Sequence, residues 1–102
     1  MLFRSLIAYR EAEPVALMML NECAAIYAGG AFGEVTELYL RPDLRSQGLA
    51  ALLIGHAIKI GRGKGWARLE VGAPNQPDWA RTLQFYRREG FTEVGPRLKR
   101  SI

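Results

Sequence analysis

The chain has 102 residues and a mass of 11.4 kDa, which is the length of one globular domain spanning residues 1–102. With 49% hydrophobic and 24% charged residues, its composition excludes a disordered or fibrous protein. Fourteen basic against ten acidic side chains give a net charge of +4, which suits an anionic ligand. Cys23 is the only cysteine, so an internal disulfide and a multi-cysteine metal site are excluded.

Membrane and targeting segments are not evident in the sequence. The longest uncharged run, residues 46–58, is shorter than the roughly 18 apolar residues that a bilayer span needs. Arg4 interrupts the apolar stretch at the N-terminus, which argues against a signal peptide. We therefore expect a cytoplasmic protein with no membrane partner and no bound metal.

Two apolar runs near the N-terminus, residues 5–10 and 15–20, are separated by the turn-forming segment 11–14. This arrangement predicts a hairpin of antiparallel strands. The second strand is expected to continue to Tyr27, either long or bulged. The adjacent glycines Gly29-Gly30 then allow the chain to reverse.

The middle of the chain changes from a strand pattern to a helix pattern and back. Residues 34–41 are rich in β-branched and aromatic types and predict a third strand, which Pro42 ends. Residues 48–61 carry apolar residues at helical spacing, and residues 68–72 read as the next strand. A strand, a helix and a strand in about 40 residues form a crossover unit, so the two strands are expected to be parallel.

A second helix is predicted to begin at residues 75–78, which supply a cap, a proline and an acid. Its apolar stripe is formed by Trp79, Leu83 and Tyr86. Gly90 stands where a left-handed residue ends a helix, and Phe91 can fold back onto the last turn. Residues 92–94 and 97–102 are expected to form two short final strands. The predicted fold class is therefore α/β with a mixed sheet.

The segment 41–50 joins the third strand to the first helix and carries the clearest chemical signal. The first N–H groups of a helix lack internal acceptors and lie at the positive end of its dipole, so they bind phosphate where no bulky side chain intervenes. Gly48 and Ala50 leave that approach open, and Arg45 adds a permanent positive charge. We therefore expect a pyrophosphate or a phosphate to bind here.

Three segments together resemble a known family. The pattern R-x-x-G-x-A at residues 45–50, the preceding E-L-Y-L-R-P-D-L-R and the later F-Y-R-R-E-G-F resemble those of the GCN5-related N-acetyltransferases (GNAT), which bind acetyl-CoA. The resemblance runs from about Leu6 to the C-terminus. It implies a GNAT-like, acyl-CoA N-acyltransferase fold: antiparallel strands, a parallel β-α-β crossover, a second helix and two short final strands.

The resemblance also implies roles for particular residues. The pyrophosphate would be held by the loop residues Arg45, Ser46, Gln47, Gly48, Leu49 and Ala50. The edge of the strand Leu38, Tyr39, Leu40 would pair with the pantetheine arm. Glu37 is in a plausible position to take a proton from the amine, and Tyr86 matches the tyrosine that protonates the departing thiolate.

The chemistry itself requires a base and an oxyanion donor. A lysine-like amine with a pKa near 10.4 is almost wholly protonated at pH 7, a handicap of roughly 4.6 kcal/mol that a base such as Glu37 reduces. The thioester carbonyl needs a donor for its developing negative charge. A bulge near Leu38–Leu40 would free a strand N–H for that purpose.

The sequence departs from the family in two places. Trp79 stands where an asparagine is frequent, and the first recognisable strand resembles the family's second. The opening strand and two helices that wall the acceptor site are therefore expected to be missing. Three explanations are open: a partner subunit completes the wall, as in a homodimer; Met1 is an internal start; or the domain binds acetyl-CoA without efficient transfer. The acceptor is expected to be a primary amine of a small molecule or a peptide.

Other interpretations stay open at this stage. The chain could be a non-catalytic acyl-CoA-binding or scaffold module, and its basic charge alone would permit a nucleic-acid binder, although it has no aromatic-basic pattern. Tyr86 would pack in an inactive protein too, and Glu37 could be a cross-strand polar partner. His56 is interpreted as a packing residue, and the glycines at 61, 63 and 65 as a helix stop.

Overall fold

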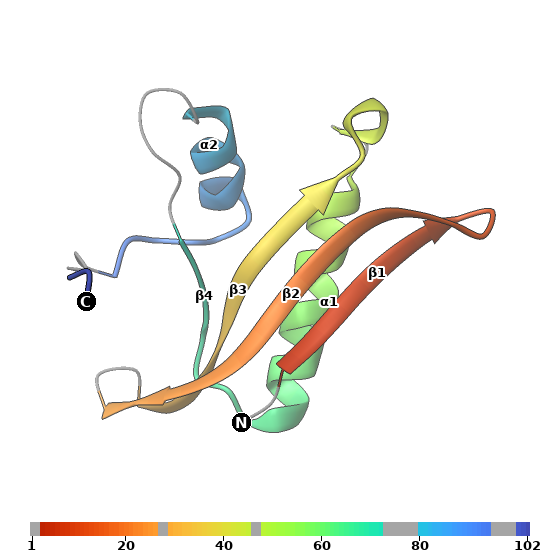
Figure 1. Ribbon diagram of the computed structural model, residues 1–102. Coiled ribbons are helices and arrows are strands. Elements are labelled where there is room, and N and C mark those ends of the chain that lie inside the picture. The colour runs from red at the N-terminus through yellow and green to blue at the C-terminus, as the bar shows by residue number, and fades with distance from the viewer. Residues whose placement is uncertain (1–2, 27–28, 46–47, 73–79, 95–99) are drawn as a thin grey trace. The chain divides into compact units, whose positions relative to one another are not determined.

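The computed structural model describes residues 3–26, 29–45, 48–72, 80–94 and 100–102 (Figure 1). The chain divides into two compact units, residues 1–72 and residues 73–102, and each is described by itself. The larger unit contains a sheet and one helix, and the smaller contains a second helix. That residues 1–102 form one domain stays a prediction.

The predicted N-terminal hairpin is confirmed. Strand β1, Phe3–Arg10, pairs antiparallel with strand β2, Glu13–Ala25. The turn is shorter than the predicted segment 11–14: only Glu11 and Ala12 connect the strands, with φ values of 50° and 72°. Two consecutive left-handed residues match the right-handed twist of the flanking strands, so the hairpin closes without the glycine that usually marks such turns.

The remaining strands complete the sheet in chain order. Strand β3, Gly30–Leu40, runs antiparallel to β2 and begins four residues earlier than residues 34–41 suggest. Strand β4, Leu69–Val71, is parallel to β3, and the sheet order is β1-β2-β3-β4. The predicted parallel crossover is therefore confirmed.

Helix α1, Leu49–Lys64, connects β3 to β4 and is longer than predicted. It continues through Gly61 and ends at Gly65, whose left-handed φ of 74° turns the chain. A Cβ atom on Gly61 would lie 2.8 Å from the ring of Trp66. Gly61 is thus a close-approach residue inside the helix, and only Gly65 acts as the stop.

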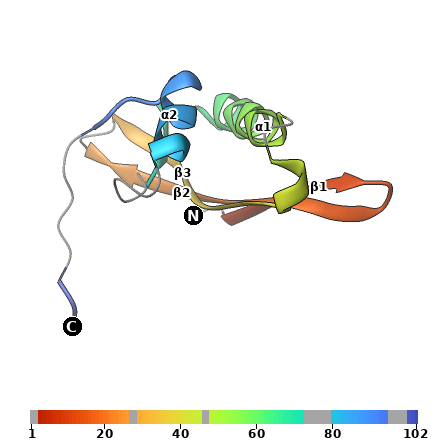
Figure 2. The same ribbon diagram turned by 90° about the horizontal axis from the view of Figure 1, so that it is seen from above.

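One face of the sheet is covered by α1 (Figure 2). Buried apolar side chains fill the layer between them: Met18, Leu20, Val35, Leu53, Ile54 and Ala57. At the far end, the ring of Trp66 occupies the space that a side chain on Gly33 would take, and its indole Nε1 donates a 2.6 Å hydrogen bond to Glu22. This packing joins β3 to the end of α1.

The smaller unit contains helix α2, Ala80–Arg88. Gly90 has a φ of 95°, and the Phe91 N–H donates a 3.0 Å hydrogen bond to the carbonyl of Tyr86, which confirms the predicted helix stop. The Phe91 ring packs edge-on against Tyr86, with centroids 5.5 Å apart. The predicted helix start at residues 75–78 lies outside the described residues, as does Trp79.

The prediction of two short final strands is wrong for those of their residues that the structure describes. Residues 92–94 and 100–102 are not in strands, and residues 95–99 lie outside the described part of the chain. The expected strand over 92–94 has only three residues and is followed by Gly95-Pro96. Proline cannot donate to a ladder and glycine weakens one, so the local sequence favours a strand only weakly.

Candidate functional site

The N-terminus of α1 has the features expected of an anion site. Gly48 is the N-cap residue, with a left-handed φ of 82° and no side-chain cap, and the first turn contains no acidic residue. The N–H groups that open a helix have no acceptor within it. Space for a side chain on Gly48 is open, since no atom lies within 4 Å of an added Cβ. The site therefore suits a phosphate group approaching the backbone.

The rest of the predicted pyrophosphate loop is described in part. Arg45 is exposed and has an extended backbone after the 3₁₀ helix η2, Pro42–Leu44. Leu49 and Ala50 form the first residues of α1 and are half-buried. Ser46 and Gln47 lie outside the described residues.

Strand β3 changes its environment halfway along. Its first half pairs with β4 through Gly33, Glu34 and Val35, which align with Leu69, Glu70 and Val71. From Thr36 to Leu40 it pairs with β2 alone, and no strand among the described residues lies along its other edge. Leu38, Tyr39 and Leu40 thus lie on the strand segment whose second edge is open, as the predicted pantetheine contact requires.

A β-bulge marks this change. Met19 of β2 pairs with Glu37 and Leu20 pairs with Val35, so Thr36 is the extra residue. The expected bulge near Leu38–Leu40 is therefore corrected to Thr36, because that position keeps the apolar residues on both sides of it facing α1. Across the sheet, Glu37 lies opposite Met19.

The bulge also decides the face on which the candidate base lies. Met18 and Leu20 are in the buried layer under α1, so Met19 and its partner Glu37 are on the other face. Glu34 pairs with Asn21 and is on that same face. Without the extra residue, two positions three apart on one strand would point to opposite faces.

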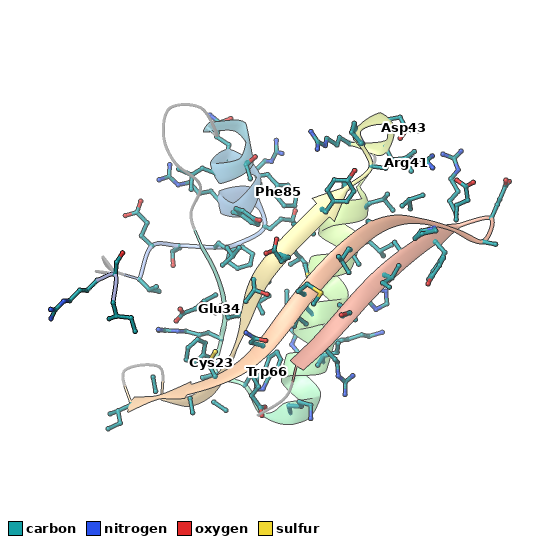
Figure 3. The ribbon with its side chains drawn as sticks, viewed as in Figure 1. Cys23, Glu34, Arg41, Asp43, Trp66 and Phe85 are labelled. Carbon is teal, nitrogen blue, oxygen red and sulfur yellow. The ribbon has the colours of Figure 1, made fainter. Side chains whose placement is uncertain are left out.

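A charged cluster near the strand junction was not predicted from the sequence. Glu70 is buried, with 6% exposed, and its Oε2 lies 2.6 Å from Nη2 of Arg68. The Arg68 guanidinium lies 5.8 Å from the centre of the Phe32 ring. In register, Glu34 is beside Glu70, and Figure 3 labels Glu34 on β3. The alternation Arg68-Leu69-Glu70 was the available signal, because it places both charges on one face of a strand.

Tyr86, the candidate acid, lies in α2 within the smaller unit. Its side chain is buried, with 8% exposed, and burial raises the pKa of its phenol above the usual value. The hydroxyl therefore stays protonated at neutral pH and is available as a donor. Its position relative to Glu37 is left open because the two residues belong to different units.

Within the described ranges, no three His, Cys, Asp or Glu side chains are grouped so as to hold a metal ion. In the same part of the chain, no helix is long and apolar enough to cross a membrane.

Comparison with known proteins identifies the family. The family model described as "Acetyltransferase (GNAT) family" matches residues 2–91, nearly the whole chain. The chain belongs to the GNAT family. The predicted resemblance and the mixed α/β GNAT fold are thereby confirmed. No curated protein matches the sequence of this GNAT chain.

Solved structures with the same fold include several acetyltransferases. An aminoglycoside N-acetyltransferase in complex with CoA is similar with a TM-score of 0.83 and 16% identity, over 98% of this chain and 75% of that one. An aminoglycoside 6′-N-acetyltransferase from Acinetobacter haemolyticus has a TM-score of 0.78 and 20% identity, over 96% and 68%. A ribosomal-protein-alanine N-acetyltransferase from Brucella melitensis has a TM-score of 0.76 and 22% identity, over 95% and 70%. This GNAT chain spans 59% to 75% of the length of the solved chains it resembles.

Proposed function

We propose that this GNAT protein transfers an acetyl group from acetyl-CoA to a primary amine. The observation that carries the proposal is the continuity of one segment in the larger unit. The half-paired end of β3 leads through η2 directly to the uncapped N-terminus of α1. A ligand with a chain of amides and a pyrophosphate matches these two features in that order.

The binding roles follow from the local chemistry. The pantetheine amides would hydrogen-bond to the open edge of Leu38–Leu40, as an added strand would. The pyrophosphate would accept hydrogen bonds from the first N–H groups of α1, starting beside Gly48, and Arg45 would supply a positive charge. Acetyl-CoA is a cosubstrate in this proposal, and no metal takes part.

The proposed reaction is a direct transfer. Glu37 takes one proton from the substrate ammonium, and the neutral amine then attacks the thioester carbonyl carbon. As the tetrahedral intermediate collapses, the carbonyl re-forms, the C–S bond breaks to release the CoA thiolate, and the amide nitrogen gives its second proton to water. A main-chain N–H beside the bulge at Thr36 would stabilise the developing oxyanion. Tyr86 donates a hydrogen bond to the thiolate. Since its raised pKa exceeds that of an ordinary thiol, about 8.5, the phenol stabilises the thiolate without having to lose its proton completely.

The acceptor class is proposed from the neighbours as well as the chemistry. Four of the similar structures are named as aminoglycoside acetyltransferases, which favours a small-molecule amine. Another is named for a ribosomal-protein alanine, so a peptide amine is kept as the alternative within the same reaction. We further propose that the protein is a cytoplasmic homodimer.

The loop assignment is tested by isothermal titration with acetyl-CoA on two matched variants. Gly48→Glu puts a bulky acid at the N-terminus of α1, whereas Gly65→Glu puts the same side chain at the other end of the same helix. Both glycines have a left-handed φ and open space, so the two variants share the backbone strain. We expect Gly48→Glu to weaken binding at least 100-fold and Gly65→Glu to leave it within about twofold.

The outcomes separate the functional alternatives. Equal affinity of wild type and Gly48→Glu would refute the loop as the binding site. If the wild type binds acetyl-CoA but releases no CoA thiol with any amine in a panel, the protein is an acyl-CoA-binding module and not an enzyme. If the protein binds RNA or DNA in a salt-sensitive way and has no affinity for CoA, both the acetyltransferase and the acyl-CoA-binding proposals are refuted, and the protein is a nucleic-acid binder.

A further inference from the structure

Arg41, the first residue after β3, is engaged by two acidic side chains from different parts of the chain. Its Nε and Nη2 donate to the two carboxylate oxygens of Asp43, at 2.7 and 3.0 Å. Its Nη1 donates to Glu13 at 3.2 Å, across 28 residues of sequence. Figure 3 shows Arg41 and Asp43 together at the end of β3. One guanidinium thus uses three donors, two of them in a fork that matches a carboxylate.

These contacts connect the candidate loop to the hairpin. Asp43 belongs to η2, while Glu13 is the first residue of β2. On its inner side η2 is anchored by the buried Leu44, and the Arg41 N–H donates to the carbonyl of Val15 at 2.8 Å. The other, outer side of η2 faces charged side chains of the hairpin turn.

A polar depression of about 340 Å³ lies on that outer side. It is lined by Arg10, Glu11, Glu13 and Arg41. Because charged side chains border this space, apolar packing does not bridge the hairpin turn and the loop there. The ion pairs of Arg41 connect them instead, and the hydrogen bonds from its guanidinium hold the pKa of Asp43 below its usual range.

We propose that Arg41 is a positioning residue for the pyrophosphate of acetyl-CoA. The inference rests on the proposed function and adds a residue to it. By holding η2 against the hairpin, Arg41 fixes the end of β3 from which the chain continues to α1, and it thereby helps to direct the first N–H groups of α1.

The effect is expected in ligand affinity rather than in stability. All three side chains are exposed to solvent, and exposed ion pairs contribute little to folding. A loop that must be ordered when the ligand binds, however, lowers affinity by the cost of ordering it. We therefore expect a change in Kd of about 5- to 10-fold with an almost unchanged melting temperature.

The experiment is titration of the full chain with acetyl-CoA, together with thermal unfolding of each variant. Arg41→Gln should raise Kd about 5- to 10-fold, and Arg41→Lys, which keeps the charge but loses the fork, should recover only part of it. Arg4→Gln is the matched control. Arg4 is exposed on β1 and makes no ion pair within the described residues, so its loss should change Kd less than twofold. The double variant Arg41→Gln with Asp43→Asn removes both charges and should stay weakened.

The outcomes distinguish a failure of the proposed function from a failure of the role proposed for Arg41. Absence of acetyl-CoA binding by the wild type would overturn the proposed function and this inference with it. Wild-type binding with an unchanged Kd in Arg41→Gln would overturn the inference alone. Full recovery of affinity in the double variant would show that charge, and not loop position, is what Arg41 controls. A fall in melting temperature with unchanged Kd would reduce Arg41 to a structural residue.

Discussion

The two halves of β3 differ in almost every physical respect, although they are one strand. The first half is paired on both edges, and its residues Phe32, Gly33 and Val35 are buried. The second half is paired on one edge, and Glu37 and Tyr39 are exposed. The bulge at Thr36 is the border. Within this single strand, one half therefore stabilises the fold, and the other half is available for binding and chemistry.

The largest effect is expected in the open half, on the rate. Glu37→Gln keeps the size of the side chain but removes its basicity, so kcat should fall about 100-fold, whereas the unfolding free energy should change by less than about 0.5 kcal/mol. The loss should shrink as the pH approaches about 10.4, where a lysine-like amine loses its own proton. A pH–rate profile of wild type and variant measures both.

Glu34→Gln is the matched variant for that experiment, because Glu34 lies on the same face but in the paired half. Full activity in Glu37→Gln with a large loss of activity in Glu34→Gln would assign the base to Glu34, which would place the reaction in the paired half of β3.

The next effect is expected in the paired half, on stability. A Cβ on Gly33 would collide with the rigid ring of Trp66, so Gly33→Ala should lower the unfolding free energy by about 2 kcal/mol. Gly55→Ala adds the same methyl group to an exposed position of α1 with open space, and should instead raise it by about 0.5 kcal/mol. Urea denaturation compares the two. Equal effects of the same sign would contradict the role given to Trp66.

The smallest effect concerns Tyr86, which belongs to neither half. Burial raises the pKa of its phenol, so its neutral form favours the folded state. This contribution is complete below the unfolded pKa of about 10 and is lost as the pH rises through the folded pKa. Wild type should therefore lose more stability than Tyr86→Phe as the pH rises above about 10. The unfolding free energy of both proteins is measured by urea denaturation at each pH. If it falls with pH in the same way for both, the tyrosine is not buried in solution.

Local patterns in the sequence were sufficient for much of the fold. The strands, the crossover and the stop at Gly90 follow from alternation, helical spacing and a glycine with a positive φ. The bulge was placed too late, although Thr36-Glu37 between Val35 and Leu38 interrupts the alternation and could have located it. A repeat of period two that skips one position implies an inserted residue.

Other features depend on distant residues, which local patterns do not contain. Gly61 continues a helix only because Trp66 returns to pack against it, so a glycine that looks like a stop is a contact. The pairing of Arg41 with Glu13 joins positions 28 apart and depends on the hairpin register. The candidate site was predictable as a loop and a strand edge, whereas its support was not.

The half-paired strand has a further consequence for how the protein behaves at high concentration. The edge of β3 from Thr36 to Leu40 that no described strand pairs with forms a short template on which another polypeptide can add a strand. If acetyl-CoA occupies the same edge, the cosubstrate also shields the protein from self-association. Colloidal stability and saturation with cosubstrate would then rise together.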